Sequence, residues 1–272
     1  MNMQLGSPVS VHPIPIYQGN YVWVMRHTSQ NSVVVVDPGS ASEVIEYITQ
    51  HELTIASIII THSHWDHVTG IAELCANLQL WRDEEPVVYG PSVIQDVTHP
   101  VEDGDRIELC KGVDVPSLQV IATPGHMPEH LSYLLPLTTP KLFCGDTLFS
   151  CGCGRILQGT HEQLRTSLDA ISALPSQTEV YCTHEYTLTN IKFARTVEPQ
   201  SQALIDYEQR VRSLRKNDLP SIPTTIEREK ALNPFLRYKE LSIQQAVENH
   251  LRLKGLTAAD VFKHLRLWKD SF

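Results

Sequence analysis

Short apolar stretches with the two-residue period of β-strands fill the first two thirds of the chain. They predict strands at 11–16, 21–25, 32–37, 57–60, 86–89, 118–122, 131–135, 141–144 and 179–182. Helical spacing follows two capping-box patterns, Ser40-x-x-Glu43 and Thr160-x-x-Gln163. A further predicted helix carries on one face Ile71, Leu74, Cys75 and Leu78. Strands interleaved with helices predict a layered α/β sandwich of two sheets covered by helices.

The pattern changes near Thr187, where strand-like runs stop and helical spacing takes over. Predicted helices cover 187–197, 201–215, 225–232, 242–253 and 257–269. The patterns Ser242-x-x-Gln245 and Thr257-x-x-Asp260 supply caps for the last two. We therefore expect two domains, residues 1–183 and a helical domain at 184–272.

The composition is that of an ordinary globular chain. Of the 272 residues, 42% are hydrophobic and 19% are charged. No apolar run approaches the length of about 18 residues that spans a bilayer, and the first ten residues show no secretory signal. We expect a cytoplasmic protein without membrane contact, and a monomer.

Charge and cysteine content restrict the function further. A formal net charge of -9 disfavours nucleic-acid binding, which normally needs a basic face. An anionic small molecule remains possible as a substrate. The six cysteines are too sparse for a disulfide scaffold and are interpreted as packing residues: Cys75, Cys110, Cys144, Cys151, Cys153 and Cys182.

The strongest chemical signal follows the isoleucine-rich strand at 57–60. Segment 61–67, THSHWDH, holds three histidines and one aspartate. In an extended chain His62 and His64 point the same way. Asp66 and His67 reach a second point if the chain turns after Trp65. Because neutral imidazole is the commonest protein ligand of divalent metals, the segment predicts two adjacent metal positions.

Three more candidate ligands follow predicted strands. His126 comes after strand 118–122, Asp146 after strand 141–144 and His184 after strand 179–182. Each residue alone is more typical of a turn or a cap. Together with segment 61–67 they complete a plausible count for two ions: three nitrogens at one, nitrogen plus carboxylate at the other, and one carboxylate between them.

Several motifs, in this order along the chain, resemble those of glyoxalase II, the hydroxyacylglutathione hydrolases of the metallo-β-lactamase superfamily. They are THSHWDH, TPGH, CGDTLFSCGCGR and THEYTLTNIKFA, and the match extends to the final Lys269 and Asp270. The first motif is common to the superfamily, whereas the later ones narrow the resemblance to this family. It implies a four-layer αββα metallo-β-lactamase sandwich followed by a helical C-terminal domain that closes over the substrate.

The resemblance also implies which residues bind each metal. The first ion would be bound by His62, His64 and His126. The second ion would be bound by Asp66, His67 and His184. Asp146 would bridge the two ions, and Asp66 and Asp146 are the residues we expect to be catalytic. Zinc is the expected metal, although this ligand set also accepts iron or manganese.

The implied reaction is hydrolysis of S-D-lactoylglutathione, and of related S-2-hydroxyacylglutathiones, to glutathione and a 2-hydroxy acid such as D-lactate. This is the second step of methylglyoxal detoxification. A hydroxide that bridges the metals would attack the thioester carbonyl, and the thiolate would leave. The family's substrate-binding positions correspond to Arg155, Tyr186, Arg266 and Lys269.

Two positions depart from the family pattern. Ser63 stands where another histidine is common, at a position that is not a ligand. Leu157 stands where some members carry an aromatic contact to the substrate.

A persulfide dioxygenase of the same superfamily, with one iron held by two histidines and one aspartate, is the alternative activity. The HEYT segment and the long helical C-terminal domain favour the hydrolase. A binding protein without catalysis is expected to have lost ligands, and this chain has all seven.

Overall fold

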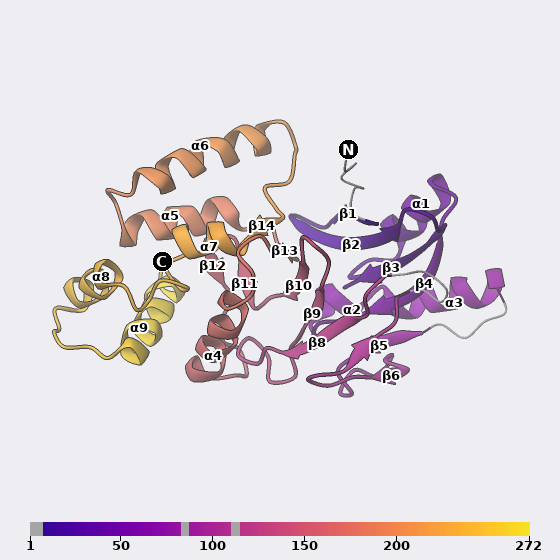
Figure 1. The fold of residues 1–272 in the computed structure, drawn as a ribbon, viewed down its shortest axis with the longest axis horizontal. Helices are drawn as coiled ribbons and strands as arrows, with labels where there is room; N and C mark the ends of the chain where they lie inside the picture. Colours follow the sequence, from indigo (N-terminus) through magenta and orange to yellow (C-terminus); the bar gives the residue numbers. More distant parts are fainter. Residues whose placement is uncertain (1–7, 83–86, 110–114) are drawn as a thin grey trace. The chain divides into compact units, whose positions relative to one another are not determined.

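A computed structural model of the chain describes residues 8–82, 87–109 and 115–272, except for the side chains of 78–82 (Figure 1). Three features predicted from the sequence fall outside this part: the side chain of Leu78, the start of a strand at Pro86, and Cys110 as a packing residue. The chain divides into two compact units. The first is Met1–Ala122 with Glu129–Gly145, and the second is Thr123–Pro128 with Asp146–Phe272.

The first unit contains a mixed sheet of six strands in sequential order, β1 to β6. Its first three strands are antiparallel and the later ones run parallel. The strands are β1 (Val9–Ile16), β2 (Asn20–His27), β3 (Ser32–Val36), β4 (Thr54–Ile59), β5 (Val88–Gly90) and β6 (His99–Pro100).

Helices of the first unit pack their apolar residues against this sheet. They are α1 (Ser42–Gln50), α2 (Trp65–Val68) and α3 (Ile71–Arg82). One buried cluster unites Val44 and Ile48 of α1 with Val33, Val35 and Ile58 of the sheet. Because β3 and β4 are parallel, the residues that follow each of them emerge at the same edge of the sheet. This edge carries the segment 61–67.

A second run of strands in the first unit is antiparallel throughout, in the order β7, β8, β9, β10. These strands are β7 (Arg106–Ile107), β8 (Leu118–Ala122), β9 (Leu131–Leu135) and β10 (Lys141–Gly145). The buried Tyr133 of β9 donates its hydroxyl to the carbonyl of Ile60, at 2.6 Å. This hydrogen bond ties β9 to the end of β4, just before the histidine-rich segment.

The second unit is mainly helical (Figure 1). It contains α4 (His161–Ser172), α5 (Thr187–Val197), α6 (Gln202–Lys216), α7 (Ile226–Leu232), α8 (Leu241–Leu251) and α9 (Ala258–Asp270). Two antiparallel strand pairs lie among the helices. They are β11 (Leu148–Phe149) with β12 (Gly152–Cys153), and β13 (Glu179–Cys182) with β14 (Thr224–Thr225). The expectation that strands end near Thr187 is therefore wrong, because β14 lies beyond it. A strand of two residues is too short to show the alternation of apolar and polar side chains from which strands are predicted.

Two of the four predicted capping boxes are present. The side chains of Thr160 and Thr257 cap α4 and α9, and each box is complete. The prediction is wrong at Ser40, because α1 begins later, after Ala41, and the Ser40 hydroxyl donates to the Glu43 carboxylate instead. It is also wrong at Ser242, which lies inside α8 and donates to Glu198 at 3.0 Å.

No helix in the described part of the chain combines the length and the apolar character that a membrane crossing requires.

The complete capping box at Thr160 should contribute to the stability of the protein, and two substitutions of Thr160 test this. We expect Thr160→Ala to lower the free energy of unfolding by about 1 kcal/mol, because the backbone N–H of Gln163 loses its acceptor. Thr160→Ser keeps the hydroxyl and should keep most of the stability. Urea denaturation of both variants measures this difference, and equal stabilities would contradict the capping role.

Candidate metal centre

His62 and His64 present two nitrogens to a common point. They follow β4, whose last residues are buried and apolar, and the chain stays extended at His64. Nε2 of His62 lies 2.9 Å from Nδ1 of His64. Two nitrogens bound tetrahedrally to one zinc ion are about 3.4 Å apart, so a small adjustment lets both coordinate the same ion.

Asp66 and His67 are turned away from that point by the short helix α2, which begins at Trp65. Oδ2 of Asp66 lies 3.9 Å from Nε2 of His67. The amide of Asn20 donates to the same carboxylate oxygen at 2.9 Å and holds its orientation. The segment therefore offers two pairs of donor atoms, one from His62 and His64 and one from Asp66 and His67.

A buried carboxylate that the sequence analysis did not single out supports this segment. Oδ2 of Asp37 lies 3.0 Å from Nδ1 of His67 and accepts the Thr61 hydroxyl at 2.8 Å, while Oδ1 accepts the Thr61 backbone N–H at 2.8 Å. A carboxylate on Nδ1 sets the tautomer of a histidine, so that Nε2 is the nitrogen able to coordinate a metal. The only signal in the sequence was an acidic residue at the end of the predicted strand 32–37, directly before Pro38.

Gly39 allows this arrangement because the backbone passes very close to it. A Cβ built at position 39 would lie 1.9 Å from the carbonyl oxygen of Asp66. Any side chain there would displace the segment that carries Asp66 and His67.

In the second unit, Asp146 lies between two histidines. Its Oδ2 is 3.6 Å from Nε2 of His126, and its Oδ1 is 3.2 Å from Nε2 of His184. All three side chains are buried. Nδ1 of His126 faces the carbonyl oxygen of Arg155 at 2.7 Å, which directs Nε2 toward the carboxylate. Each oxygen of one carboxylate thus faces a different histidine.

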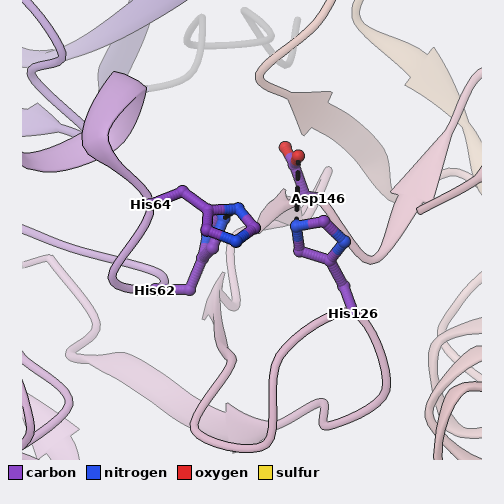
Figure 2. A group of neighbouring side chains, drawn as sticks. All are labelled: His62, His64, His126 and Asp146. Carbon is purple, nitrogen blue, oxygen red and sulfur yellow. Dashed lines mark hydrogen bonds and ion pairs between the residues drawn. The ribbon is translucent and has the colours of Figure 1, made fainter. Parts of the chain in front are cut away.

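The described side chains include two sets that could each hold a metal ion, and Figure 2 draws the first. The first set is His62, His64, His126 and Asp146, and the second is Asp66, His67 and His184. The dashed line in Figure 2 marks the ion pair of His126 with Asp146. Imidazole nitrogens mixed with carboxylate oxygens suit zinc, iron and manganese, so the residues present fit a metal centre of the expected kind.

The four candidate substrate-binding residues all belong to the second unit. Tyr186 is 45% exposed, and its ring stacks on that of His184 with centroids 4.6 Å apart. The Arg155 side chain is largely exposed, and its Nε lies 3.9 Å from Oδ1 of Asp270. Leu157, where some family members have an aromatic contact, is also exposed.

Arg266 and Lys269 are not solvated surface charges. Arg266 is 1% exposed, and its Nη1 donates to the carbonyl of Cys153 at 3.0 Å. Lys269 donates to the side-chain oxygen of Asn190. Burial, with the positive charge of Arg266 nearby, lowers the pKa of Lys269 to about 8. Its ammonium group therefore titrates much closer to neutrality than an exposed lysine does.

The cysteines in the described part are free thiols, and only Cys75 is partly exposed. Burial raises the pKa of Cys151 and of Cys153, so neither forms a thiolate readily. Both observations agree with the interpretation of these residues as packing side chains.

Two family models match this chain in succession, from residue 17 to residue 272. The model of the metallo-beta-lactamase superfamily matches residues 17–184, and that of the hydroxyacylglutathione hydrolase C-terminus matches residues 185–272. The hydroxyacylglutathione hydrolase of Aliivibrio fischeri (strain ATCC 700601 / ES114) is 42% identical over 266 residues, which cover 97% of this chain and 100% of that protein. Hydroxyacylglutathione hydrolase 2 of Vibrio vulnificus (strain YJ016) is 43% identical with the same coverage.

Solved structures agree on the fold. The BLEG-1 B3 metallo-beta-lactamase superposes with a TM-score of 0.62 at 21% identity, covering 84% of this chain and 99% of its own. The predicted fold class, a metallo-β-lactamase domain followed by a helical C-terminal domain, is confirmed. The chain belongs to the hydroxyacylglutathione hydrolase family of the metallo-β-lactamase superfamily.

Proposed function

We propose that the protein is a metal-dependent thioester hydrolase that cleaves S-D-lactoylglutathione and related S-2-hydroxyacylglutathiones. The products are glutathione and a 2-hydroxy acid such as D-lactate, as in the second step of methylglyoxal detoxification. The relatives named hydroxyacylglutathione hydrolase, similar over the full length, support this reaction. Residues 1–183 would form the catalytic domain and residues 184–272 the substrate-binding domain.

The observation that best supports a centre with two metal ions is the position of Asp146 between His126 and His184. We assign to the first ion His62, His64 and His126, and to the second ion Asp66, His67 and His184, with Asp146 shared by both. Zinc is the proposed metal, and iron or manganese suits the same donors. When bound, two such cations lower the pKa of water and stabilise negative charge on a carbonyl oxygen.

The protein's own residues orient these ligands and the substrate. Asp37 holds His67, Asn20 holds Asp66, and the Arg155 carbonyl holds His126. The charged side chains of Arg155, Arg266 and Lys269 suit the carboxylates of a glutathionyl group, and the half-exposed side chain of Tyr186 offers an aromatic ring for a further contact. A thiolate is a good leaving group, so no strong general acid is needed, and the buried cysteines need not act as nucleophiles.

The remaining proposals concern the location, the partners and the assembly of the protein. The free cysteines suit a reducing, cytoplasmic location. The net charge of -9 suits a small-molecule substrate better than a nucleic acid. We propose that the protein acts as a monomer.

Hydrolysis of S-D-lactoylglutathione by the purified protein tests the function directly. We expect release of glutathione, its loss after chelator treatment, and close to two metals per chain counted on the same sample. A protein that does not hydrolyse the thioester, carries one iron and consumes oxygen with glutathione persulfide would be a dioxygenase instead.

The role of Asp146 gives a second test. We expect Asp146→Ala to lower kcat by about 10²- to 10³-fold or more, because both proposed ions lose a shared ligand. Metal analysis should show fewer than two ions per chain. The exposed carboxylate of Asp96 provides a control, since Asp96→Ala should change neither quantity. An Asp146→Ala protein with full activity would rule out the bridge.

The lowered pKa of Lys269 predicts a pH dependence. In the free enzyme the ammonium is charged below pH 8 and neutral above it. Attraction for a substrate carboxylate is therefore lost as the pH rises through this value, and kcat/KM should fall by up to about tenfold per pH unit. Lys269→Met should have a low kcat/KM without this fall. Lys263, an exposed lysine on the same helix, is the control, and Lys263→Met should keep the wild-type profile. An unchanged profile in Lys269→Met would contradict the assignment.

A further inference from the structure

Residues 147–154, which we call the ligand hairpin, connect two residues of the proposed site. The hairpin contains β11 and β12, and it begins after Asp146 and ends before Arg155. Its two ends are packed tightly together. The backbone N–H of Gly154 donates to the carbonyl of Thr147 at 3.2 Å, and a Cβ at position 154 would lie 2.0 Å from the carbonyl oxygen of Asp146. A shift of the hairpin would therefore move the backbone of Asp146.

Glu229 of α7 contacts the turn of this hairpin from inside the second unit. Its carboxylate accepts the backbone N–H of Cys151 at 2.7 Å. It also accepts the Thr224 hydroxyl at 2.7 Å and the side-chain amide of Asn233 at 2.9 Å. The residue is 0% exposed. A carboxylate in this position is surrounded by hydrogen-bond donors rather than by solvent.

Asn233, which ends α7, contacts the hairpin on either side of the same turn. Its Nδ2 donates to the carbonyl of Gly152 at 2.8 Å and lies 3.2 Å from that of Phe149. Asn233 is also fully buried. Two side chains of α7 thus hold the backbone at three positions of the turn, Phe149, Cys151 and Gly152. The turn contains a non-glycine residue in the left-handed region, Cys151 with φ 56°.

A stabilising role alone does not explain a buried carboxylate well. Burial opposes ionisation and raises the pKa of Glu229. Apolar side chains of similar volume often stabilise a core as well as buried polar groups do. Hydrogen bonds to particular backbone atoms, in contrast, determine the path of the chain. The contacts of Glu229 and Asn233 are of this second kind.

We propose that Glu229 and Asn233 are positioning residues for the metal centre. They hold the ligand hairpin in the path that presents Asp146 to the metals at one end and Arg155 to the substrate at the other. Neither residue touches the reacting atoms. The inference rests on the proposed function for the role of Asp146 as a metal ligand.

Glu248 of α8 provides a matched control within the same unit. It is also buried, and its carboxylate also accepts backbone N–H groups, from Gly255 at 2.8 Å and from Leu256 at 3.1 Å. The loop that it holds carries none of the proposed site residues. Removing either carboxylate should destabilise the protein, but only the loss of Glu229 should disturb the metals.

The experiment compares Glu229→Ala, Asn233→Ala and Glu248→Ala in the full chain. Metals per chain are counted after dialysis against graded chelator, kcat and KM are measured, and unfolding in urea reports stability. We expect Glu229→Ala and Asn233→Ala to lower metal affinity and kcat by about 10- to 100-fold. Glu248→Ala should keep both values while losing comparable stability.

Glu229→Gln adds a rescue that a general loss of packing would not predict. The glutamine oxygen can accept from Cys151 and Asn233, and its NH₂ can donate to the Thr224 hydroxyl, which can turn to accept. Metal retention should therefore return close to the wild-type value.

The outcomes separate this proposal from the proposed function. If folded Glu229→Ala and Asn233→Ala proteins retain metal and kcat like the wild type, or if Glu248→Ala loses metal equally, the positioning role is wrong. If Glu229→Ala does not fold, Asn233→Ala decides. If the wild type binds metal but does not hydrolyse the thioester, the proposed reaction fails, and metal retention still tests the positioning role.

Discussion

The ligand-bearing segment of the first unit depends on one buried carboxylate. Asp37 follows β3 and bonds to both the backbone and the hydroxyl of Thr61, which follows β4. The same carboxylate contacts His67. One side chain therefore joins two parallel strands at their ends and sets the orientation of a proposed ligand. A buried carboxylate is tolerated there because the Thr61 N–H and hydroxyl both donate hydrogen bonds to it.

In the second unit a proposed ligand is held through its backbone instead of through its side chain. There a carboxylate, Asp146, is itself a proposed ligand, and two histidine nitrogens face its oxygens. Its position is secured through the backbone, because Gly154 packs against its carbonyl oxygen. Glu229 and Asn233 hold the turn that connects these two points. In both units a buried acidic side chain outside the ligand set holds the backbone near the ligands, and the donors around it compensate for its desolvation.

Local patterns predicted much of the fold. The helix 187–197 was predicted with the bounds that the structure has, and the capping boxes at Thr160 and Thr257 are present. The same pattern failed at Ser40 and Ser242, since a capping box depends on where the backbone enters the helix. The two-residue strands β6, β7, β11, β12 and β14 were not predicted, because a pair of residues has no measurable period.

By itself, the sequence determined the fold class, the family and the kinds of donor atom. Ligand spacing in segment 61–67 and residues after strand ends are local properties, so they are visible in a linear chain. Only the tertiary structure decided which buried residues hold those ligands, as Asp37 does for His67 and Glu229 for the turn at Cys151. Glu229 and Cys151 are 78 residues apart, and no periodicity or motif connects them. The physical reason is that a hydrogen bond between distant residues exists only after the chain has folded and excluded water from both partners.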